Sequence, residues 1–281
     1  MNTRTLISVD DLQRQLAEPA LVVFDCRHDL MQPDAGAEAY ARSHLPGARF
    51  AQCDQDLSGA KTGKTGRHPL PDPAVFSAWL GRNGVDSSKQ VVTYDHAGGA
   101  SATRLWWLLR HWLGHERVAV LDGGWEAWVA AGAPVSAEVA QVAPASFSGT
   151  PRAVSVDVSY VLSHLNDPDL VVIDARAPER YRGETEPIDP VAGHIPGARN
   201  RLYKNNLDAS GRFKTAEALR AEFTALLAGM RPDQIVHQCG SGVSACHNIL
   251  AMEIAGLTGS KLYPGSWSEW CADPSRPIAR G

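Results

Sequence analysis

The sequence lacks three features: an apolar run long enough to span a membrane, a block of like charges, and a low-complexity tract. Its first residues, MNTRTLISVDDLQRQL, turn polar at once and lack the apolar core of a signal peptide. The net charge of -4 gives no electrostatic reason to expect nucleic acid or an anionic membrane surface as a partner. We therefore expect a protein whose partners include neither nucleic acid nor a membrane.

Cysteine is scarce and scattered. The chain holds five cysteines, an odd number, and no two of them form a C-x-x-C pair. This pattern is unlike a disulfide framework and favours a reducing compartment, so we expect a cytoplasmic protein. His237 stands close to Cys239, but the two are a poor start for a tetrahedral metal site. We accordingly predict no metal and no cofactor.

The chain repeats itself. Its 281 residues, 44% of them hydrophobic, suffice for two domains of ordinary size. Four stretches recur in the same order: SVDDLQRQLAEPALVVFDCR (8–27) as SVDVSYVLSHLNDPDLVVIDAR (155–176), HLPGAR (44–49) as HIPGAR (194–199), VVTYDHAGGASA (91–102) as IVHQCGSGVSAC (235–246), and DGGWEAW (122–128) as PGSWSEW (264–270). Ordered matches of this kind indicate two homologous domains. We predict an N-terminal domain at 1–140, a linker at 141–151 and a C-terminal domain at 152–281.

In each half, apolar stretches of strand length alternate with helical ones. The strand candidates are LVVF, VVTY and VAVL in the first half and LVVI, IVHQ and KLY in the second. Helices are expected at 75–85, 103–113, 216–227 and 245–256, and behind the caps Ser8 and Ser155. Apolar strands without alternation suit a sheet that is buried on both faces. We predict an α/β fold of two tandem domains, each a parallel sheet flanked by helices on both faces. Loops at the carboxyl ends of such strands build the functional sites.

Cys239 stands at the end of one predicted strand, in HQCGSGVSAC (237–246). If the strand ends near Gln238 and a helix begins near Ala245, the amides between them curl around the sulfur as an anion nest. Such a nest favours thiolate over thiol, whereas the alternative is a buried cysteine before an ordinary turn. In the first half the equivalent residue is Asp95, and a residue kept only for packing would rarely be Cys in one copy and Asp in the other. We infer one catalytic half and one half retained as a scaffold.

These motifs together resemble the two-domain rhodanese family. The resemblance covers nearly the whole chain and rests on the DxR after the first strand, H-[IL]-P-G-A, G-x-W-x-x-W and CGSGVSA. It implies sulfur transfer: the Cys239 thiolate takes a sulfane sulfur from a small-molecule donor, becomes a persulfide, and passes the sulfur to a thiophilic acceptor such as thioredoxin, another thiol or cyanide. Cysteine phosphatases of similar fold need an arginine six residues after the cysteine, and this chain has Ala245 there.

The loop sequence also separates donors within the family. Thiosulfate-using members resemble Cys-Arg-Lys-Gly-Val-Thr-Ala, with two cations for a dianion, and mercaptopyruvate-using members resemble Cys-Gly-Ser/Thr-Gly-Val-Thr-Ala. This chain matches the second pattern with Ser in place of Thr, and its loop residues are expected to bind the donor: Gly240, Ser241, Gly242, Val243, Ser244 and Ala245. The expectation is 3-mercaptopyruvate as donor and pyruvate as product. Thiosulfate is the alternative donor, and a non-catalytic sulfur carrier or sensor is a more distant one.

The resemblance also implies roles outside the loop. Arg180 in RAPERYRG aligns with a substrate-binding arginine that would hold the donor's carboxylate. A second arginine, frequent in the following acidic stretch, is missing from GETEPIDPVAGH, and Arg182 or Arg104 could replace it. Ser241 is expected in a relay with a His and an Asp from the N-terminal domain, and the residues that align are His68 and Asp54. The Asp-x-Arg pairs and the paired tryptophans recur in both halves and are expected to be structural.

Overall fold

The computed structural model describes residues 4–281 and divides into two compact units. The N-terminal unit comprises the described residues up to Gly59, Leu70–Arg152 and Ser210–Arg212. The C-terminal unit comprises Ala60–Pro69, Ala153–Ala209 and Phe213–Gly281. A segment from within the first half of the sequence, 60–69, therefore belongs to the C-terminal unit. The stretch 141–151 packs on the N-terminal unit, where the Ala145 amide donates to the Gly81 carbonyl.

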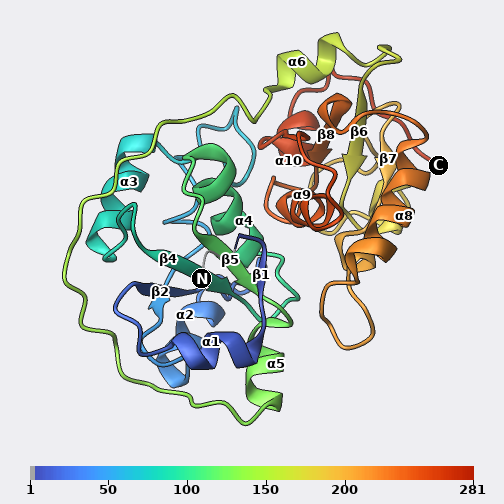
Figure 1. Ribbon diagram of the computed structural model, residues 1–281. Coiled ribbons are helices and arrows are strands. Elements are labelled where there is room, and N and C mark those ends of the chain that lie inside the picture. The colour runs from blue at the N-terminus through green and yellow to red at the C-terminus, as the bar shows by residue number, and fades with distance from the viewer. Residues whose placement is uncertain (1–3) are drawn as a thin grey trace. The chain divides into compact units, whose positions relative to one another are not determined.

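The N-terminal unit is built on a five-stranded parallel sheet with strand order β1-β5-β4-β2-β3 (Figure 1). Its strands are β1 Leu6–Ile7, β2 Leu21–Asp25, β3 Arg49–Phe50, β4 Gln90–Tyr94 and β5 Val118–Leu121. Its helices are α1 Val9–Gln15, α2 Ala35–Arg42, α3 Pro73–Arg82, α4 Ala102–Trp107 and α5 Gly124–Ala130. The helix predicted at 103–113 changes from α to π geometry at Leu108, and the π-helical turn η1 spans Leu108–Trp112.

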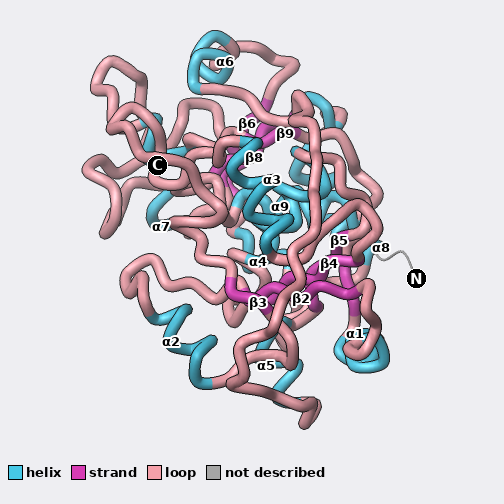
Figure 2. Tube along the Cα trace, turned by 90° about the vertical axis from the view of Figure 1, so that its left-hand side faces the viewer, coloured by secondary structure: helices cyan, strands magenta, loops and turns pink. Residues whose placement is uncertain are grey.

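Helices cover both faces of this sheet. Figures 1 and 2 show α1, α2 and α5 on one face and α3 and α4 on the other. Successive strand residues supply the two cores because their side chains alternate between faces. Val23 packs with Leu12 of α1 and Trp128 of α5, whereas the ring of the next residue, Phe24, stacks on Trp79 of α3 at 5.2 Å. The predicted sandwich is confirmed for this unit.

The C-terminal unit repeats this architecture with a four-stranded parallel sheet, in the strand order β7-β6-β8-β9. Its strands are β6 Val171–Asp174, β7 Arg199–Asn200, β8 Ile235–Gln238 and β9 Lys261–Leu262. Its helices are α6 Val158–Ser163, α7 Pro178–Tyr181, α8 Ala216–Leu227, α9 Ala245–Ile254 and α10 Ser266–Trp270, with short 3-10 turns η2 Tyr203–Asn206 and η3 Pro232–Gln234. One core cluster joins Val161 of α6 and Trp267 and Trp270 of α10 to the sheet residues Val172 and Val236.

One helix start differs from the prediction. Ser8 caps α1 as expected, because its side chain accepts a hydrogen bond from the Asp11 amide. In the second half the cap is Asp157, whose carboxylate accepts from the Tyr160 amide at 2.8 Å. Ser155 instead forms an isolated parallel bridge with Leu262. The predicted cap at Ser155 is therefore wrong by two residues, although the sequence SVD is identical in the two halves.

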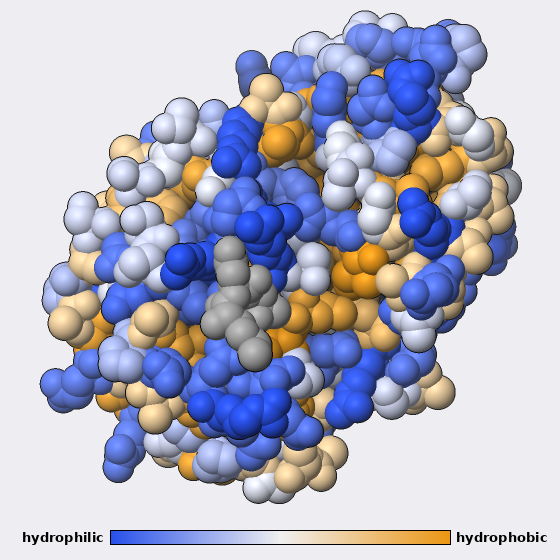
Figure 3. Space-filling view, viewed as in Figure 1, coloured by the Kyte–Doolittle hydropathy of each residue, from blue (hydrophilic) through white to orange (hydrophobic). Residues whose placement is uncertain are grey.

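Polar side chains dominate the surface drawn in Figure 3, where the most hydrophobic residues lie mainly in recesses between hydrophilic ones. The apolar strand residues are buried in the two sheets. Within residues 4–281, no helix combines the length and the apolar character that crossing a membrane requires.

Candidate active site

Cys239 follows the last residue of β8 and is only 2% exposed. Its backbone is fixed by the start of α10. The Cys239 amide donates to the Ser266 hydroxyl at 3.1 Å, and the Cys239 and Gly240 carbonyls accept from the amides of Trp267 and Ser268 at 3.0 and 2.9 Å. Ser266 holds a left-handed φ of 54°, which a non-glycine residue adopts only at some cost in free energy. Three hydrogen bonds thus fix the backbone of Cys239 and Gly240.

The loop after Cys239 turns the Gly242 amide toward the sulfur. The Gly242 amide donates to Cys239 Sγ at 3.1 Å, and the loop enters α9 at Ala245. Gly242 has a φ of 78°, and a Cβ there would lie 2.5 Å from the Pro264 carbonyl oxygen. Only glycine therefore permits this turn without strain. For the amides of Ser241 and Val243, no protein acceptor is recorded within residues 4–281.

The equivalent loop of the N-terminal unit, which begins at Asp95, binds a carboxylate with its backbone amides. The Asp95 carboxylate accepts four backbone hydrogen bonds of 2.7–2.8 Å, and their donors are the amides of Ala97, Gly99, Ser101 and Ala102. A loop of this length can therefore direct four backbone amides at one carboxylate. The Asp95 carboxylate fills its own nest, whereas the Cys239 sulfur accepts from the Gly242 amide.

His68 and Ser241 meet in the C-terminal unit. His68 Nδ1 lies 2.7 Å from Ser241 Oγ, and both side chains are buried. The segment that carries His68 is docked on the turn before α10: a Cβ on Gly66 would lie 2.3 Å from the Gly265 carbonyl oxygen. The Arg67 amide also donates to Ser268 Oγ at 3.0 Å. Two of the residues expected to form a relay are thus in hydrogen-bond contact.

Asp54, the third expected member, belongs to the N-terminal unit. There its carboxylate lies 4.0 Å from His28 Nδ1. Its role in the relay stays a prediction.

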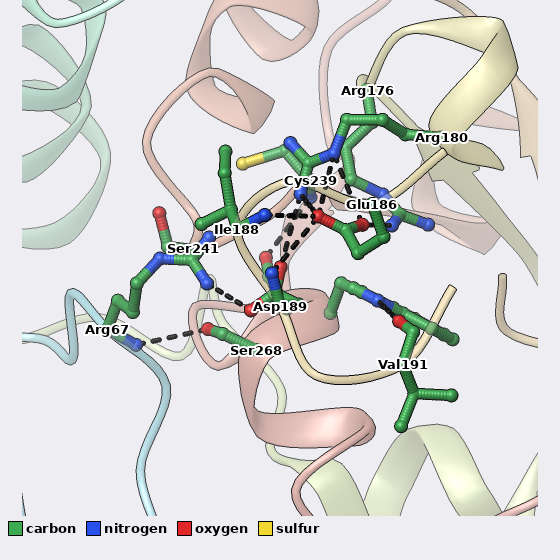
Figure 4. Close-up of polar contacts among 12 residues, drawn as sticks. Arg67, Arg176, Arg180, Glu186, Ile188, Asp189, Val191, Cys239, Ser241 and Ser268 are labelled. Atoms are coloured by element: carbon green, nitrogen blue, oxygen red, sulfur yellow. Dashed lines mark hydrogen bonds and ion pairs between the residues drawn. The ribbon is translucent and has the colours of Figure 1, made fainter. Parts of the chain in front are cut away.

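Arginines and carboxylates gather near Cys239, where Figure 4 shows Arg67 and Arg180 with Glu186 and Asp189. A Cβ on Gly240 would lie 2.9 Å from Arg67 Nη2, and 3.8 and 3.9 Å from the Nη1 and Nη2 atoms of Arg180. Arg180 donates through Nε and Nη2 to Glu186, at 3.1 and 2.6 Å, and through Nη2 to Asp189 at 3.2 Å. Arg67 Nη1 donates to the other Asp189 oxygen. The two guanidinium groups therefore share one carboxylate at the edge of the cysteine loop.

Burial and ion pairing set the protonation of these acids. Burial alone would raise the pKa of Glu186, but the hydrogen bond and charge of Arg180 bring that pKa below its usual value. Burial raises the pKa of Asp189 above its usual value, against the lowering effect of Arg67. The site holds its carboxylates close to its arginines, so the positive charge is largely balanced within the protein.

Of the three arginines considered from the sequence, only Arg180 is placed beside Gly240. Arg182 is half-exposed and pairs with Glu184 at 2.7 Å, and Arg104 belongs to the N-terminal unit, where it is buried and donates to the Leu57 carbonyl. Sequence reasoning missed Arg67, Glu186 and Asp189. The available signal for Arg67 was its position immediately before His68.

Comparison with known proteins agrees with this geometry. The family model of the rhodanese-like domain matches the chain twice, at residues 8–131 and 157–273. This chain belongs to the rhodanese family. It is 48% identical over 284 residues to a probable 3-mercaptopyruvate sulfurtransferase of Pseudomonas aeruginosa, a match that covers 100% of both chains. It is 39% identical to a putative thiosulfate sulfurtransferase, SseB, of Mycobacterium tuberculosis, covering 95% of this chain and 93% of the relative.

Solved structures give the same family. The crystal structure of SseA from Escherichia coli, described as a 3-mercaptopyruvate sulfotransferase, superposes with a TM-score of 0.81 at 31% identity. The match covers 95% of this rhodanese and 100% of the E. coli chain. The predicted fold class, two rhodanese-like α/β domains with parallel sheets, is therefore confirmed.

The Asp-x-Arg pair of this rhodanese is structural in both units. In the C-terminal unit Arg176 Nη2 donates to Asp174 at 2.7 Å, and the guanidinium carbon lies 4.6 Å from the Trp267 ring centroid. The same arrangement recurs in the N-terminal unit, in Asp25, Arg27 and Trp125. The repeated tryptophans therefore cover a buried ion pair.

Proposed function

We propose that this protein is a sulfurtransferase that moves a sulfane sulfur from 3-mercaptopyruvate, through a Cys239 persulfide, to a thiol acceptor. One observation carries the choice of donor: the cationic groups near the cysteine stand outside the loop. Gly240 and Ser241 contribute no charge, while Arg67 and Arg180 approach Gly240 from other segments. A donor with its carboxylate remote from the transferred sulfur suits this arrangement better than a compact dianion.

The reaction proceeds in two steps. The Cys239 thiolate attacks the donor's sulfur, and an S–S bond forms as the C–S bond breaks. The electron pair of the C–S bond goes to the methylene carbon, and the resulting enolate takes up a proton and leaves as pyruvate. An acceptor thiolate then attacks the outer sulfur of the persulfide, and the S–S electron pair returns to Cys239.

Ser241 and the loop amides assist where charge develops. If His68 Nδ1 donates its hydrogen to Ser241 Oγ, the hydroxyl hydrogen can reach the donor's carbonyl oxygen as the enolate forms. The amides of Ser241, Gly242 and Val243 are proposed to hold the anionic sulfur of the thiolate and then of the persulfide. Asp54 is proposed to orient His68, from the family resemblance alone.

The acceptor and compartment are further proposals. A thiol acceptor such as thioredoxin suits the persulfide chemistry. A cytoplasmic location is supported by the cysteines, all of which lie within residues 4–281 and none of which forms a disulfide.

Thiosulfate is the second candidate donor, favoured by the 39% identity to the putative thiosulfate sulfurtransferase. The deciding experiment measures kcat/KM for 3-mercaptopyruvate and thiosulfate side by side, with Cys239→Ala as control. We expect 3-mercaptopyruvate to be preferred by about tenfold or more, which corresponds to roughly 1.4 kcal/mol. A preference for thiosulfate would overturn the choice of donor.

Mass spectrometry tests the intermediate. After incubation with the donor, the protein should gain one sulfur on Cys239 and lose it when thiol is added, and Cys246→Ser should behave like the unmodified chain. If no donor produces a persulfide, the protein is a binding module rather than an enzyme.

A further inference from the structure

We propose that Arg67 is a second donor-binding arginine and that its Nε–Nη2 edge takes the carboxylate of the donor beside Arg180. This inference rests on the proposed function and names the residue that replaces the arginine missing from 183–194. Arg67 comes from the segment 60–69, far from the loop in sequence, yet within the same unit.

The position of Arg67 is fixed by several contacts. Gly66 fits against the Gly265 carbonyl with no room for a Cβ, and the Arg67 amide is bonded to Ser268. The side chain is anchored at its tip by Asp189 through Nη1. Only 22% of the side chain is exposed, so the guanidinium reaches Gly240 from a well-packed segment.

The edge of Arg67 that faces away from Asp189 has no partner among residues 4–281. Its Nε–H is buried and makes no hydrogen bond, and no acceptor is recorded for Nη2. A buried donor left unsatisfied is unfavourable, so an acceptor that enters here is favoured. The Nε–Nη2 edge is the fork that binds carboxylates in a bidentate manner.

The other arginines of the site already use this edge. Arg176 donates through Nε and Nη2 to Asp174, and Arg180 donates through the same two atoms to Glu186. Arg67 alone among the three keeps the fork open, and its Nη2 is the protein atom nearest to the position that a Cβ on Gly240 would occupy. This contrast assigns Arg67 to ligand binding and Arg176 to structure. Arg180 faces Gly240 with Nη1 as well, an atom that its bonds to Glu186 and Asp189 do not use.

Asp189 is the shared counter-ion that keeps the two arginines in place. One of its oxygens accepts from Arg67 and the other from Arg180. The donor's carboxylate can therefore bind to the open edge of Arg67 without displacing Asp189. In 3-mercaptopyruvate only a methylene and a carbonyl carbon separate the sulfur from the carboxylate, so a carboxylate held above Gly240 leaves the sulfur near Cys239.

The test replaces Arg67 by Met and by Lys and measures KM and kcat with 3-mercaptopyruvate. Arg67→Met should raise KM about tenfold or more, as expected for the loss of a charge-assisted hydrogen-bonded pair, with kcat within about threefold of the unmodified enzyme. Arg67→Lys should recover part of the loss, because it keeps the charge but not the fork. Arg182→Met is the matched control, since Arg182 pairs with Glu184 near the surface, and its KM should not change.

Two further measurements separate binding from structure. Persulfide formation from inorganic polysulfide, which has no carboxylate, should be nearly unchanged in Arg67→Met, and so should the urea midpoint of unfolding. An unchanged KM for 3-mercaptopyruvate overturns the inference. A parallel loss with polysulfide, or a large fall in stability, also overturns it, because Arg67 would then act on the fold or the nucleophile.

Failure of the proposed function is distinguishable from failure of this inference. If the unmodified protein prefers thiosulfate, the donor assignment fails, yet the dissociation constant of pyruvate still reports on the carboxylate site. Weaker pyruvate binding in Arg67→Met than in Arg182→Met would uphold the role of Arg67. Equal binding in the two variants would overturn it.

Discussion

Substitution by alanine should affect two glycines of the cysteine loop, Gly240 and Gly242, in different ways. The φ of Gly240 is not in the left-handed region, and the atoms that a Cβ would meet are the ends of two flexible arginines, at 2.9, 3.8 and 3.9 Å. Gly242 has a φ of 78°, and a Cβ there would meet three backbone atoms of Pro264, at 2.5, 2.9 and 3.0 Å. The first substitution disturbs a binding group, and the second disturbs the backbone of the loop.

The magnitudes follow from these contacts. For Gly240→Ala we expect a change in unfolding free energy of less than about 1 kcal/mol, because the close contact is with one side-chain atom, Arg67 Nη2, and a small rotation of that side chain relieves it while its bond to Asp189 is kept. For Gly242→Ala the left-handed backbone costs about 1–2 kcal/mol, and the contact with a fixed carbonyl adds a cost of similar size. The expected loss is therefore about 3 kcal/mol.

Urea unfolding, followed by the fluorescence of the eight tryptophans, measures both variants, and steady-state kinetics with 3-mercaptopyruvate accompany it. Gly240→Ala should raise KM by displacing Arg67 while the urea midpoint stays close to that of the unmodified protein. The reasoning is refuted if Gly240→Ala is destabilised as much as Gly242→Ala. It is also refuted if Gly242→Ala unfolds at the original midpoint.

Further predictions concern Asp95, Ser266 and His237. Asp95→Asn turns an amide N–H₂ toward backbone donors and should lower the unfolding free energy by about 3 kcal/mol in urea titrations, whereas the exposed Asp10→Asn should not. Ser266→Gly relieves a left-handed backbone but removes the hydroxyl that is bonded to the Cys239 amide. The unfolding free energy should therefore change little, while persulfide formation, followed by stopped flow, should become slower. An unchanged rate would contradict this role of Ser266. Burial lowers the pKa of His237 to about 3, so the unfolded chain binds a proton that the folded chain does not, and stability falls as the pH drops below about 6.5. His237→Leu should make this decline shallower by about 1.4 kcal/mol per pH unit in unfolding titrations between pH 6 and 5, and equal slopes would contradict the assignment.

The fold was largely predictable because its signals are local. LVVF, VVTY and IVHQ are apolar without alternation, as strands buried on both faces must be, and all three lie within strands of the structure. The helix start at Ser155 was wrong because the matching letters precede the position where the chain turns into α6. The cap is set by that turn, and Asp157 stands there.

The candidate site was predictable where its residues are close together in the sequence. Cys239 and the glycines that shape its nest lie in one loop between a strand and a helix, so their spacing carried the inference. Arg67 carried no such signal. Its hydrogen bond to Ser268 joins residues 201 positions apart, and no periodicity or local motif reports a contact of that range.

The segment 60–69 has a consequence for how the two copies of the ancestral domain depend on each other. After a duplication, each copy could in principle be separated again at the junction near Arg152. Here the second copy carries Cys239, but Arg67 and His68 approach the residues that follow it, Gly240 and Ser241, from a stretch encoded within the first copy. A protein cut at Arg152 would therefore yield a second half without its serine's imidazole partner. The boundary between the two sequence repeats therefore differs from the boundary of the compact unit that contains Cys239.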